Sequence, residues 1–444
     1  MRNVDAAGLG IGDDHPPRIM GVLNVSEESP YDPSVYDDPG EAAAYVDEEL
    51  IGEGADIVDV GLESANKDLD VLSAEQELDR LDTAVETLES TSGDAVWSIE
   101  TRYHEVADEA LSRGFDMVND ICGFADPEMP RVCREHDAAV SKMASPPDLE
   151  RPGAIEDVDW AARSAAGPER SWSYADGIYE ALSMNGFTDK TILDPAFGGW
   201  SAAKTHADDR ETFHRLREFR GYGRPLLVSI NRKSFLKTVA GRTTEEALPV
   251  SLAATSMAVE RGAHVIRTHD VAETRDAALV GAEFARDRHR SDRGGGAVAV
   301  EELDVTTVRE AERHLDRIGA AEAPAGTDDE RAAAGNAVVR TYELSGLRDA
   351  AVGALRAATV GGDAAGATFA LGDANSANPP TAPSATDGGT GDARNDDSLG
   401  EGSAGARRGL LIGTPAAIDS VRAAVSGVSD SLDAAFDGID RDVK

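Results

Sequence analysis

The stretch IMGVLNV, residues 19–25, decides the fold because it is the first in a series of similar runs. It is apolar except for Asn24 near its end. The later runs are also rich in Val, Ile or Leu, which is typical of strands in a buried parallel sheet. These further runs are ADIVDVG (55–61), AVWSIET (95–101), MVNDIC (117–122), AAVSKMA (138–144), TILDPAFG (191–198), PLLVSINR (225–232) and HVIRTHD (264–270).

Segments of helical character separate these runs. AEQELDRLDTAVETLES (74–90) and TEEALPVSLAATSMAVERG (244–262) show most clearly the three- and four-residue spacing of apolar side chains. Eight strand–helix units within roughly 250 residues have the size and pattern of a (β/α)8 barrel. We therefore predict a TIM barrel at residues 18–287, after an N-terminal extension at residues 1–17. A doubly wound open sheet is the alternative fold.

Most of the predicted strands end in a polar or charged residue. The carboxyl ends of the strands in a parallel barrel all emerge on one face, and the active sites of such barrels lie there. The sequence therefore predicts a polar ring at that face. Its members are Asn24, Asp59, Glu100, Asn119, Asp194, Asn231, Lys233, Arg267 and His269.

The sequence changes character after residue 287. We predict a linker at residues 288–297, which include the stretch RHRSDRGGG, and a small α/β domain at residues 298–444. Residues 373–408 are rich in Gly, Ser, Ala, Asp, Pro and Asn, which predicts a disordered insertion within that domain. No chemical motif is evident in this part of the sequence.

The 444-residue chain has a formal net charge of −40, and its acidic residues are spread along its length. Such self-repulsion is associated with halophiles, so we expect adaptation to a salty cytoplasm. An acidic surface that binds a partner is the alternative interpretation. Nucleic acid is not an expected partner, because phosphate binding needs a basic face. The sequence has no signal-peptide pattern and no apolar run long enough for a membrane span, so we predict a cytoplasmic location without membrane contact.

The motifs at the predicted strand ends resemble those of the dihydropteroate synthases, which are pterin-binding TIM barrels. The resemblance implies a transferase of folate or pterin biosynthesis. In that reaction a dihydropterin hydroxymethyl diphosphate loses pyrophosphate to 4-aminobenzoate or a related arylamine. The resemblance also predicts that the protein forms a homodimer. The matching motifs, in the family's order from residue 18 to residue 285, are IMGVLNVS, GADIVDVGLES, VNDICG, LDPAFG, SINRKSFL and VIRTHDV.

The resemblance also implies how the substrates are bound. Asp194 would anchor the pterin ring through charge-assisted hydrogen bonds, and the Asn119 amide would complement it. Lys233 would contact the ring, and Ser234 would help to receive the benzoate carboxylate. Each residue has a structural alternative: a helix N-cap for Asp194, a strand-end turn for Asn119, and a solvated loop for the segment that contains Lys233 and Ser234.

Arg267 and His269 lie two residues apart on a predicted strand and therefore share a face. They look like a diphosphate clamp, because arginine grips phosphate bidentately and histidine adds a donor. The resemblance thus implies catalytic roles for Lys233, Arg267 and His269. It also implies that Asn24 touches Mg²⁺, a metal ion that suits a diphosphate. The alternative for Asn24 is a strand-end cap.

The sequence departs from the family pattern in three places. The first loop, NVSEESPYDPSVYDD, keeps only half of the usual motif. The second loop, ESANKDLD, has Ala65 and Asn66 where the family has threonine and arginine. The substrate-binding carboxylate of the third motif is Glu100 rather than aspartate. These changes predict a modified arylamine acceptor. A pterin-binding methyltransferase and a non-catalytic pterin-binding protein are the alternative functions.

Overall fold

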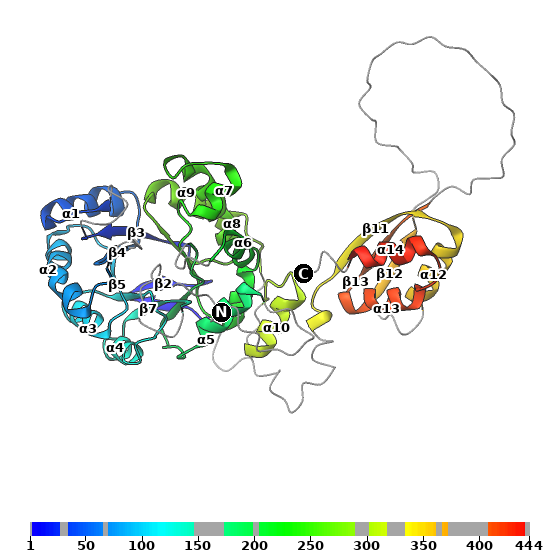
Figure 1. Cartoon of the computed structure of the whole chain (residues 1–444), viewed down its shortest axis with the longest axis horizontal. Helices are drawn as coiled ribbons and strands as arrows, with labels where there is room; N and C mark the ends of the chain where they lie inside the picture. The colour runs from blue at the N-terminus through cyan, green and yellow to red at the C-terminus, as the bar shows by residue number, and fades with distance from the viewer. Residues whose placement is uncertain are drawn as a thin grey trace, which may run out of the picture. The chain divides into compact units, whose positions relative to one another are not determined.

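The computed structural model of the chain describes residues 2–26, 34–64, 70–145, 173–198, 204–288, 302–317, 334–360, 366–371 and 407–439. The chain divides into two compact units, residues 1–304 and residues 305–444 (Figure 1). The predicted linker at residues 288–297 lies outside the described residues, except for Arg288. The predicted insertion at residues 373–408 also lies outside them, except for its last two residues.

The first unit is a (β/α)8 barrel, which confirms the predicted fold class. Its eight parallel strands are hydrogen-bonded in the order β8-β7-β6-β5-β4-β3-β10-β9, and a parallel bridge between Leu193 and Leu226 joins the two outer members. The alternative of an open doubly wound sheet is therefore wrong. Every strand overlaps one of the predicted apolar runs. The strands are β3 (Arg18–Asn24), β4 (Ile57–Gly61), β5 (Val96–Thr101), β6 (Met117–Asp120), β7 (Ala139–Met143), β8 (Thr191–Asp194), β9 (Leu227–Val228) and β10 (Val265–Thr268).

Helices surround these strands (Figure 1). Local sequence explains where several of them begin. For example, Ser73 and Gln76 form a reciprocal capping box at the start of α2. The helices are α1 (Pro39–Tyr45, continued by the π-helical turn Val46–Ile51), α2 (Ala74–Ser90), α3 (His104–Ser112), α4 (Met129–Glu135), α5 (Tyr174–Ser183), α6 (His206–His214, followed by the 3-10 segment Leu216–Tyr222), α7 (Ser234–Ala240), α8 (Leu248–Glu260, preceded by the 3-10 turn Glu245–Ala247) and α9 (Val271–Glu283).

An apolar layer closes the amino end of the barrel. The N-terminal residues, which the sequence suggested only as an extension, form an antiparallel hairpin of β1 (Val4–Ala6) and β2 (Leu9–Ile11). The buried side chains of this hairpin join a single cluster with one residue from each barrel strand. The contributing strand residues are Met20, Ile57, Val96, Met117, Ala139, Ile192, Leu227 and Val265. The strand residues that line this end are therefore apolar, and the end also contains a buried ion cluster of Asp13 with Arg220 and His264.

The second unit contains a three-stranded antiparallel sheet in the order β11-β13-β12. Its buried residues, which include Leu355, Leu411 and Val421, form a core separate from that of the barrel. This arrangement agrees with the predicted small α/β domain. Its elements are α10 (Val308–Arg317), β11 (Arg340–Leu347), α12 (Asp349–Val360), β12 (Ala367–Leu371), β13 (Arg407–Gly413), α13 (Pro415–Val425) and α14 (Asp430–Ile439).

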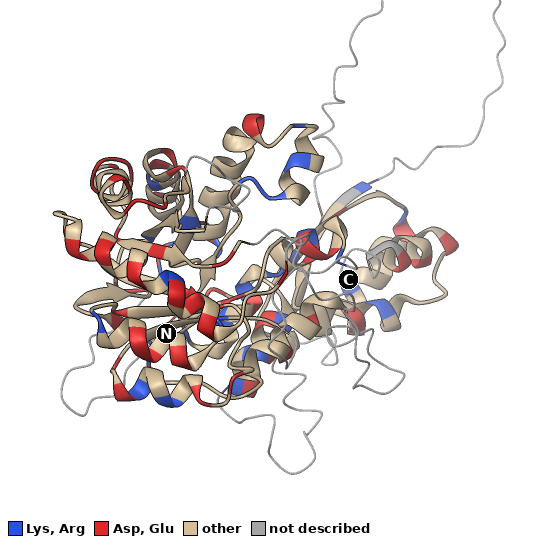
Figure 2. Cartoon of the chain, turned by 60° about the vertical axis from the view of Figure 1, so that its left-hand side comes forward, with Lys and Arg blue, Asp and Glu red and all other residues tan. Residues whose placement is uncertain are grey.

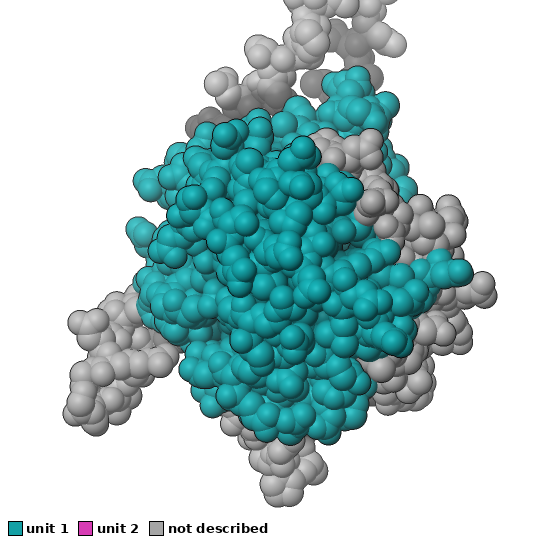
Figure 3. All heavy atoms as spheres, turned by 90° about the vertical axis from the view of Figure 1, so that its left-hand side faces the viewer, with its two compact units in different colours: residues 1–304 teal, residues 305–444 magenta. Residues whose placement is uncertain are grey.

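The surface of the chain reflects its acidic composition. Aspartate and glutamate residues are prominent on the helices in Figure 2. The side of the first unit that Figure 3 shows is convex and closely packed. None of the described helices is both long enough and apolar enough to cross a membrane.

Candidate active site

Asp59 is the centre of a polar network inside the carboxyl end of the barrel. It is the third residue of β4, and its side chain is fully buried. Its Oδ1 accepts a hydrogen bond from Ser98 Oγ at 2.7 Å. Its Oδ2 accepts hydrogen bonds from Asn119 Nδ2 at 3.0 Å and from Arg267 Nε at 2.7 Å. Asp59 therefore ties together side chains from four strands, β4, β5, β6 and β10.

Arg267 extends this network to Glu100. Its Nη2 donates a hydrogen bond to Glu100 Oε2 at 2.6 Å. Burial opposes the charge of Arg267, but the carboxylates of Glu100 and Asp59 raise its pKa, so the guanidinium stays cationic. Burial raises the pKa of Glu100, although Arg267 opposes that shift. Two buried carboxyl groups thus share one guanidinium, and this part of the site would be stabilised by a further cation.

Asp194 and Lys233 form the second part of the site. Asp194 is the last residue of β8 and is 5% exposed, and its Oδ1 accepts the backbone N–H of Ala196 at 2.7 Å. Burial raises the pKa of Asp194 to about 6, against the opposing charges of Lys233 and Arg267. Burial and the nearby Arg267 lower the pKa of Lys233. The lysine side chain crosses to the loop after β8, where a Cβ on Gly198 would lie 3.0 Å from its Nζ.

A third group of side chains links the first and last strands of the barrel. Asn24 Nδ2 donates a hydrogen bond to Ser34 Oγ at 3.0 Å, and Ser34 Oγ lies 3.2 Å from His269 Nδ1. Burial, followed by the positive charges of Arg267 and Lys233, lowers the pKa of His269 to about 3. The imidazole is therefore neutral at pH 7, beside two cations.

An ion pair holds the loop that carries Lys233 against the loop after β10. Asp270 accepts hydrogen bonds from Arg232 Nη2 and Nε, each at 2.8 Å, and from Asn231 Nδ2 at 2.8 Å. Arg232 has a φ of +52°, a conformation that residues with a Cβ rarely adopt. The ion pair restricts movement of Lys233 relative to Arg267 and His269, since the two loops cannot separate without breaking the pair.

The barrel matches the family model described as "Pterin binding enzyme" over residues 20–269. This match covers more than half of the 444 residues. The chain belongs to the pterin-binding enzyme family. Within this family it is similar to dihydropteroate synthases, which confirms the resemblance inferred from the motifs. The Escherichia coli K12 dihydropteroate synthase is 30% identical over 279 residues, which are 62% of this chain and 94% of that protein.

Two further relatives define the extent of the similarity. A Halobacterium salinarum protein named "Probable bifunctional folylpolyglutamate synthase/dihydropteroate synthase" is 32% identical over 57% of this chain, but the match spans only 30% of that longer protein. A structure of the Coxiella burnetii dihydropteroate synthase in complex with pteroic acid is 26% identical, with a TM-score of 0.51, and it matches 63% of this chain and 98% of its own. The similarity to this pterin-binding enzyme therefore concerns the barrel unit.

The structure brings the predicted site residues to one rim of this pterin-binding barrel. Glu100 and Asn119 meet around Asp59 and Arg267, while Lys233 and Asp194 adjoin the same guanidinium electrostatically. Asn24 and His269 are linked through Ser34, and Ser234 is the exposed first residue of α7. Their individual roles toward substrates stay predictions.

Sequence reasoning named Asp59 as a strand-end polar residue but gave it no role in binding or catalysis. A charged residue inside the otherwise apolar run ADIVDVG was the available signal, because an isolated buried charge is costly and needs a partner. Two buried residues near Lys233, Lys204 and Asp209, were also missed. The altered second-loop positions Ala65 and Asn66 lie outside the described residues.

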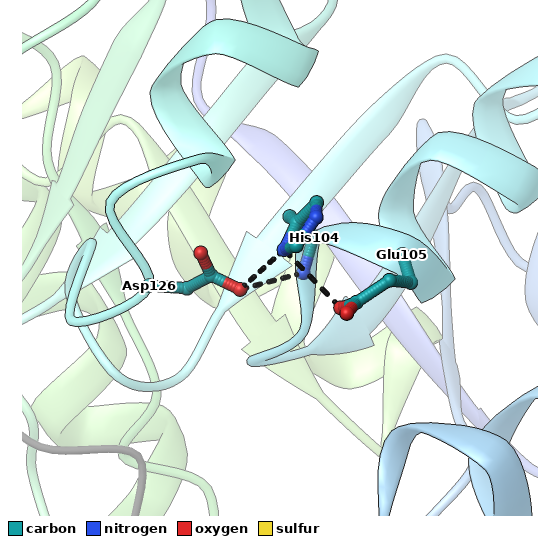
Figure 4. Close-up of side chains that lie close together, drawn as sticks. All are labelled: His104, Glu105 and Asp126. Carbon is teal, nitrogen blue, oxygen red and sulfur yellow. Dashed lines mark hydrogen bonds and ion pairs between the residues drawn. The ribbon is translucent and has the colours of Figure 1, made fainter.

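A separate group, His104, Glu105 and Asp126, has side chains close enough together to hold a metal ion (Figure 4). Its contacts have a simpler explanation. Asp126 Oδ2 accepts the backbone N–H of His104 at 3.0 Å and lies 2.8 Å from His104 Nδ1, and Asp126 Oδ1 accepts the backbone N–H of Glu128 at 3.0 Å. The carboxylate therefore ties the start of α3 to the loop before α4, and both of its oxygens are used in doing so.

Proposed function

We propose that the barrel is a dihydropteroate synthase. It joins a dihydropterin hydroxymethyl diphosphate to 4-aminobenzoate or a related arylamine. The bond between the pterin methylene carbon and the diphosphate oxygen breaks, and a bond from that carbon to the amine nitrogen forms. Pyrophosphate leaves with the electron pair, and the amine loses a proton to solvent. One observation carries this proposal: the buried carboxylate of Asp194 lies on the same rim as the cationic side chains of Lys233 and Arg267.

The pterin end of the site is suited to a flat heterocycle with a row of donors. An ionised Asp194 can accept hydrogen bonds from the ring amino group and from an adjacent ring N–H, in a charge-assisted pair. Asn119 already donates its amide N–H to Asp59, so its amide oxygen is the group that faces a ligand donor. Because the pKa of Asp194 is about 6, the carboxylate is mostly ionised at pH 7 and is available as an acceptor.

The diphosphate end supplies positive charge where negative charge develops. Arg267 is held in place by two carboxylates, and Lys233 adjoins it. Donors fixed in advance at a developing charge account for much of the rate enhancement in many enzymes. His269 is neutral beside these cations, and an incoming polyanion would raise its pKa and allow it to donate a second hydrogen bond. We expect bond breaking to precede amine attack, with a carbocation-like pterin between the two steps.

Magnesium suits the remaining oxygen atoms at this rim. The point that a Cβ on Gly61 would occupy lies 2.9 Å from Asn24 Oδ1 and 3.9 Å from Glu100 Oε1. These are hard oxygen donors, and the excess negative charge of Asp59 and Glu100 favours a cation beside them. Mg²⁺ held by Asn24 would neutralise charge on the departing diphosphate. The side chains of this chain would then orient the pterin and the leaving group around it.

The acceptor end is the altered part of the site. Ser234, at the exposed start of α7, is the residue proposed to meet the carboxylate of the arylamine. The changed loop sequence ESANKDLD supports an arylamine that differs from plain 4-aminobenzoate. The C-terminal unit has no role in this proposal.

A product assay in high salt tests the function. The chain is incubated with a dihydropterin hydroxymethyl diphosphate, Mg²⁺ and a panel of arylamines that includes 4-aminobenzoate, and pyrophosphate and the pterin product are measured together. We expect one pyrophosphate per joined product. Asp194→Asn should remove turnover, while Asp137→Asn, at the exposed amino end of the barrel, should not. Metal-independent binding without turnover of any arylamine would support a non-catalytic pterin-binding protein, and binding of reduced folate alone would support a methyltransferase.

A further inference from the structure

Lys204 and Asp209 form a buried ion pair next to the proposed pterin pocket. Lys204 Nζ lies 2.6 Å from Asp209 Oδ1, and the two side chains are only 2% and 5% exposed. Removing two charges from water costs several kcal/mol per ion, so a buried pair is weak evidence for a contribution to stability. The contacts of this pair with the loop after β8 indicate a different role.

Both members of the pair hold the backbone of that loop. Lys204 Nζ donates a hydrogen bond to the carbonyl oxygen of Ala196 at 2.6 Å. Asp209 Oδ1 accepts the N–H of Gly198 at 3.1 Å. Ala196 has a φ of +61°, which residues with a Cβ rarely adopt, so the peptide needs such external support.

The peptide groups of Ala196 and Gly198 lie directly against Asp194 and Lys233. The N–H of Ala196 points to Asp194 Oδ1 at 2.7 Å and so sets the orientation of that carboxylate. Gly198 leaves room for the neighbouring lysine, since a Cβ there would lie 2.9 Å from Lys233 Cδ. A shift of this loop would therefore misplace Asp194 and Lys233 together.

We propose that Lys204 and Asp209 are positioning residues for the pterin pocket: they fix the loop at residues 194–198, and the charge of Lys204 helps to keep Asp194 ionised. This inference rests on the proposed function, because it assumes that Asp194 binds the pterin. Neither residue needs to touch the substrate. The pair acts through Asp194 and through the space kept for Lys233.

The charge of Lys204 should lower the pKa of Asp194. Burial raises the pKa of Asp194 to about 6, and three cations oppose the rise: Lys233, Arg267 and Lys204. Asp209 and Glu100 face Lys233, and Asp209 also pairs with Lys204, where it opposes the burial that lowers the pKa of that lysine. Removing the charge of Lys204 while the other cations remain should raise the pKa of Asp194 further, so that an ionised carboxylate forms only at higher pH.

The test is binding of a free dihydropterin, without diphosphate or metal, to the full chain between pH 5 and pH 9. We expect wild-type affinity to fall below a midpoint near pH 6, where Asp194 takes up a proton. In Lys204→Met the midpoint should rise by roughly one unit, which lowers affinity about fivefold at pH 6 and about twofold at pH 7. The ligand's own titration is common to all variants and does not affect this difference.

Three further variants separate positioning from simple structural support. Lys204→Arg keeps the charge and should restore the wild-type midpoint. Lys204→Gln keeps a donor for the Ala196 carbonyl but not the charge, so it should show the raised midpoint even where the methionine variant fails to fold. Lys190→Met is the matched control. Its ammonium pairs with Asp137 at 2.9 Å at the opposite end of β8, and its loss should leave the midpoint unchanged.

The outcomes distinguish this inference from the proposed function. A wild-type midpoint together with wild-type affinity in the folded Lys204→Met protein would overturn the positioning role, even if thermal stability fell. A midpoint that Lys204→Arg fails to restore would overturn the electrostatic part. A wild-type chain that binds no dihydropterin at any pH would instead overturn the proposed function, together with everything that rests on it.

Discussion

The strand residues inside the barrel differ in kind between its two ends, although the same eight strands supply both. At the amino end, one apolar residue from each strand packs with the hairpin β1–β2, and Ile11 is fully buried there. At the carboxyl end, Asp59, Glu100, Asp194 and Arg267 are held in or beside the barrel interior. One end therefore stabilises the fold by burying apolar surface, while the other keeps charged groups partly out of water.

This difference indicates which residues of the barrel stabilise the fold and which serve the proposed binding site at a cost in stability. Burial of apolar side chains lowers the free energy of the folded state without any ligand. Burial of charged groups raises it unless partners compensate, and the raised pKa of Asp194 and of Glu100 reflects this cost. Substitutions at the two ends should therefore change stability and binding in different combinations. Trp97 is 5% exposed on β5, so its fluorescence reports unfolding of the barrel.

Arg267→Met should produce the largest loss of stability. Its guanidinium bonds Asp59 and Glu100 at 2.7 Å and 2.6 Å, so its removal leaves the fully buried Asp59 and the partly buried Glu100 without this cation. Breaking one side of a buried pair typically costs about 3–5 kcal/mol. Tryptophan-detected denaturant unfolding in a fixed high-salt buffer measures this loss. A variant as stable as the wild type would mean that the two acids are protonated at rest, and that Arg267 is not needed to hold them.

This result changes how Arg267 must be tested as a ligand for diphosphate. An alanine or methionine variant would lose affinity partly because the site itself rearranges. Affinities for the diphosphate substrate and for the free pterin therefore have to be compared at a denaturant-free condition where the variant is shown to be folded. A larger loss for the diphosphate supports the clamp, and equal losses indicate a structural role alone.

Ile11→Ala should come next and should affect only stability. Ile11 is fully buried between the hairpin and the floor of the barrel, so truncation removes apolar contacts and leaves a cavity. Such a change costs about 3 kcal/mol. The matched control is Leu279→Ala on α9, where the side chain is 42% exposed. Dihydropterin affinity of the folded Ile11→Ala protein should equal that of the wild type, and a change in affinity would contradict the separation of the two ends.

Asp194→Asn should act in the opposite direction and stabilise the protein without ligand. The pKa of Asp194 is raised from 3.8 to about 6, so the folded protein binds a proton more tightly than the unfolded chain does. The cost of its ionisation is absent below pH 4, grows as the pH rises through 6, and then stays constant at up to about 3 kcal/mol. The asparagine variant should therefore be more stable than the wild type at pH 7.5 and nearly equal at pH 4. The same variant should bind dihydropterin weakly at all pH values, and a stability gap independent of pH would contradict this account.

The sequence predicted the barrel well because its strands are buried on both faces. Runs such as ADIVDVG and HVIRTHD stand out from their surroundings without any knowledge of tertiary contacts. The hairpin at Val4–Ile11 was not predicted, since two three-residue strands are too short to show a periodicity. Its apolar residues are explained only by the structure, in which they cover the amino end of the barrel.

The sequence predicted which residues gather at the site but not which hydrogen bonds and ion pairs join them. Strand-end positions identified Glu100, Asn119, Asp194 and Arg267, because a parallel barrel gathers its carboxyl ends by construction. The partner of each charge was not predictable in the same way. Asp59 and Arg267 are 208 residues apart in sequence, and only the closed barrel brings them within 2.7 Å. Lys204 was missed because its role depends on backbone groups of a loop, which leave no trace in the pattern of side chains.

Arg113→Met should cause the smallest loss of stability, and it provides a reference for the loss caused by Arg267→Met. Arg113 pairs with Asp82 at 2.7 Å, the same separation as between Arg267 and Asp59, but the side chains are 32% and 71% exposed rather than 17% and 0%. An exposed pair is screened by solvent and salt, so its loss should cost less than about 1 kcal/mol. The same unfolding measurement, repeated at two salt concentrations, compares the two arginines directly. If both variants lost equal stability, the depth of burial would not explain the carboxyl end of the barrel. The expected inequality reflects solvent exclusion together with the second close carboxylate of Arg267, Glu100 at 2.6 Å, for which Arg113 has only the more distant Glu109 at 3.9 Å.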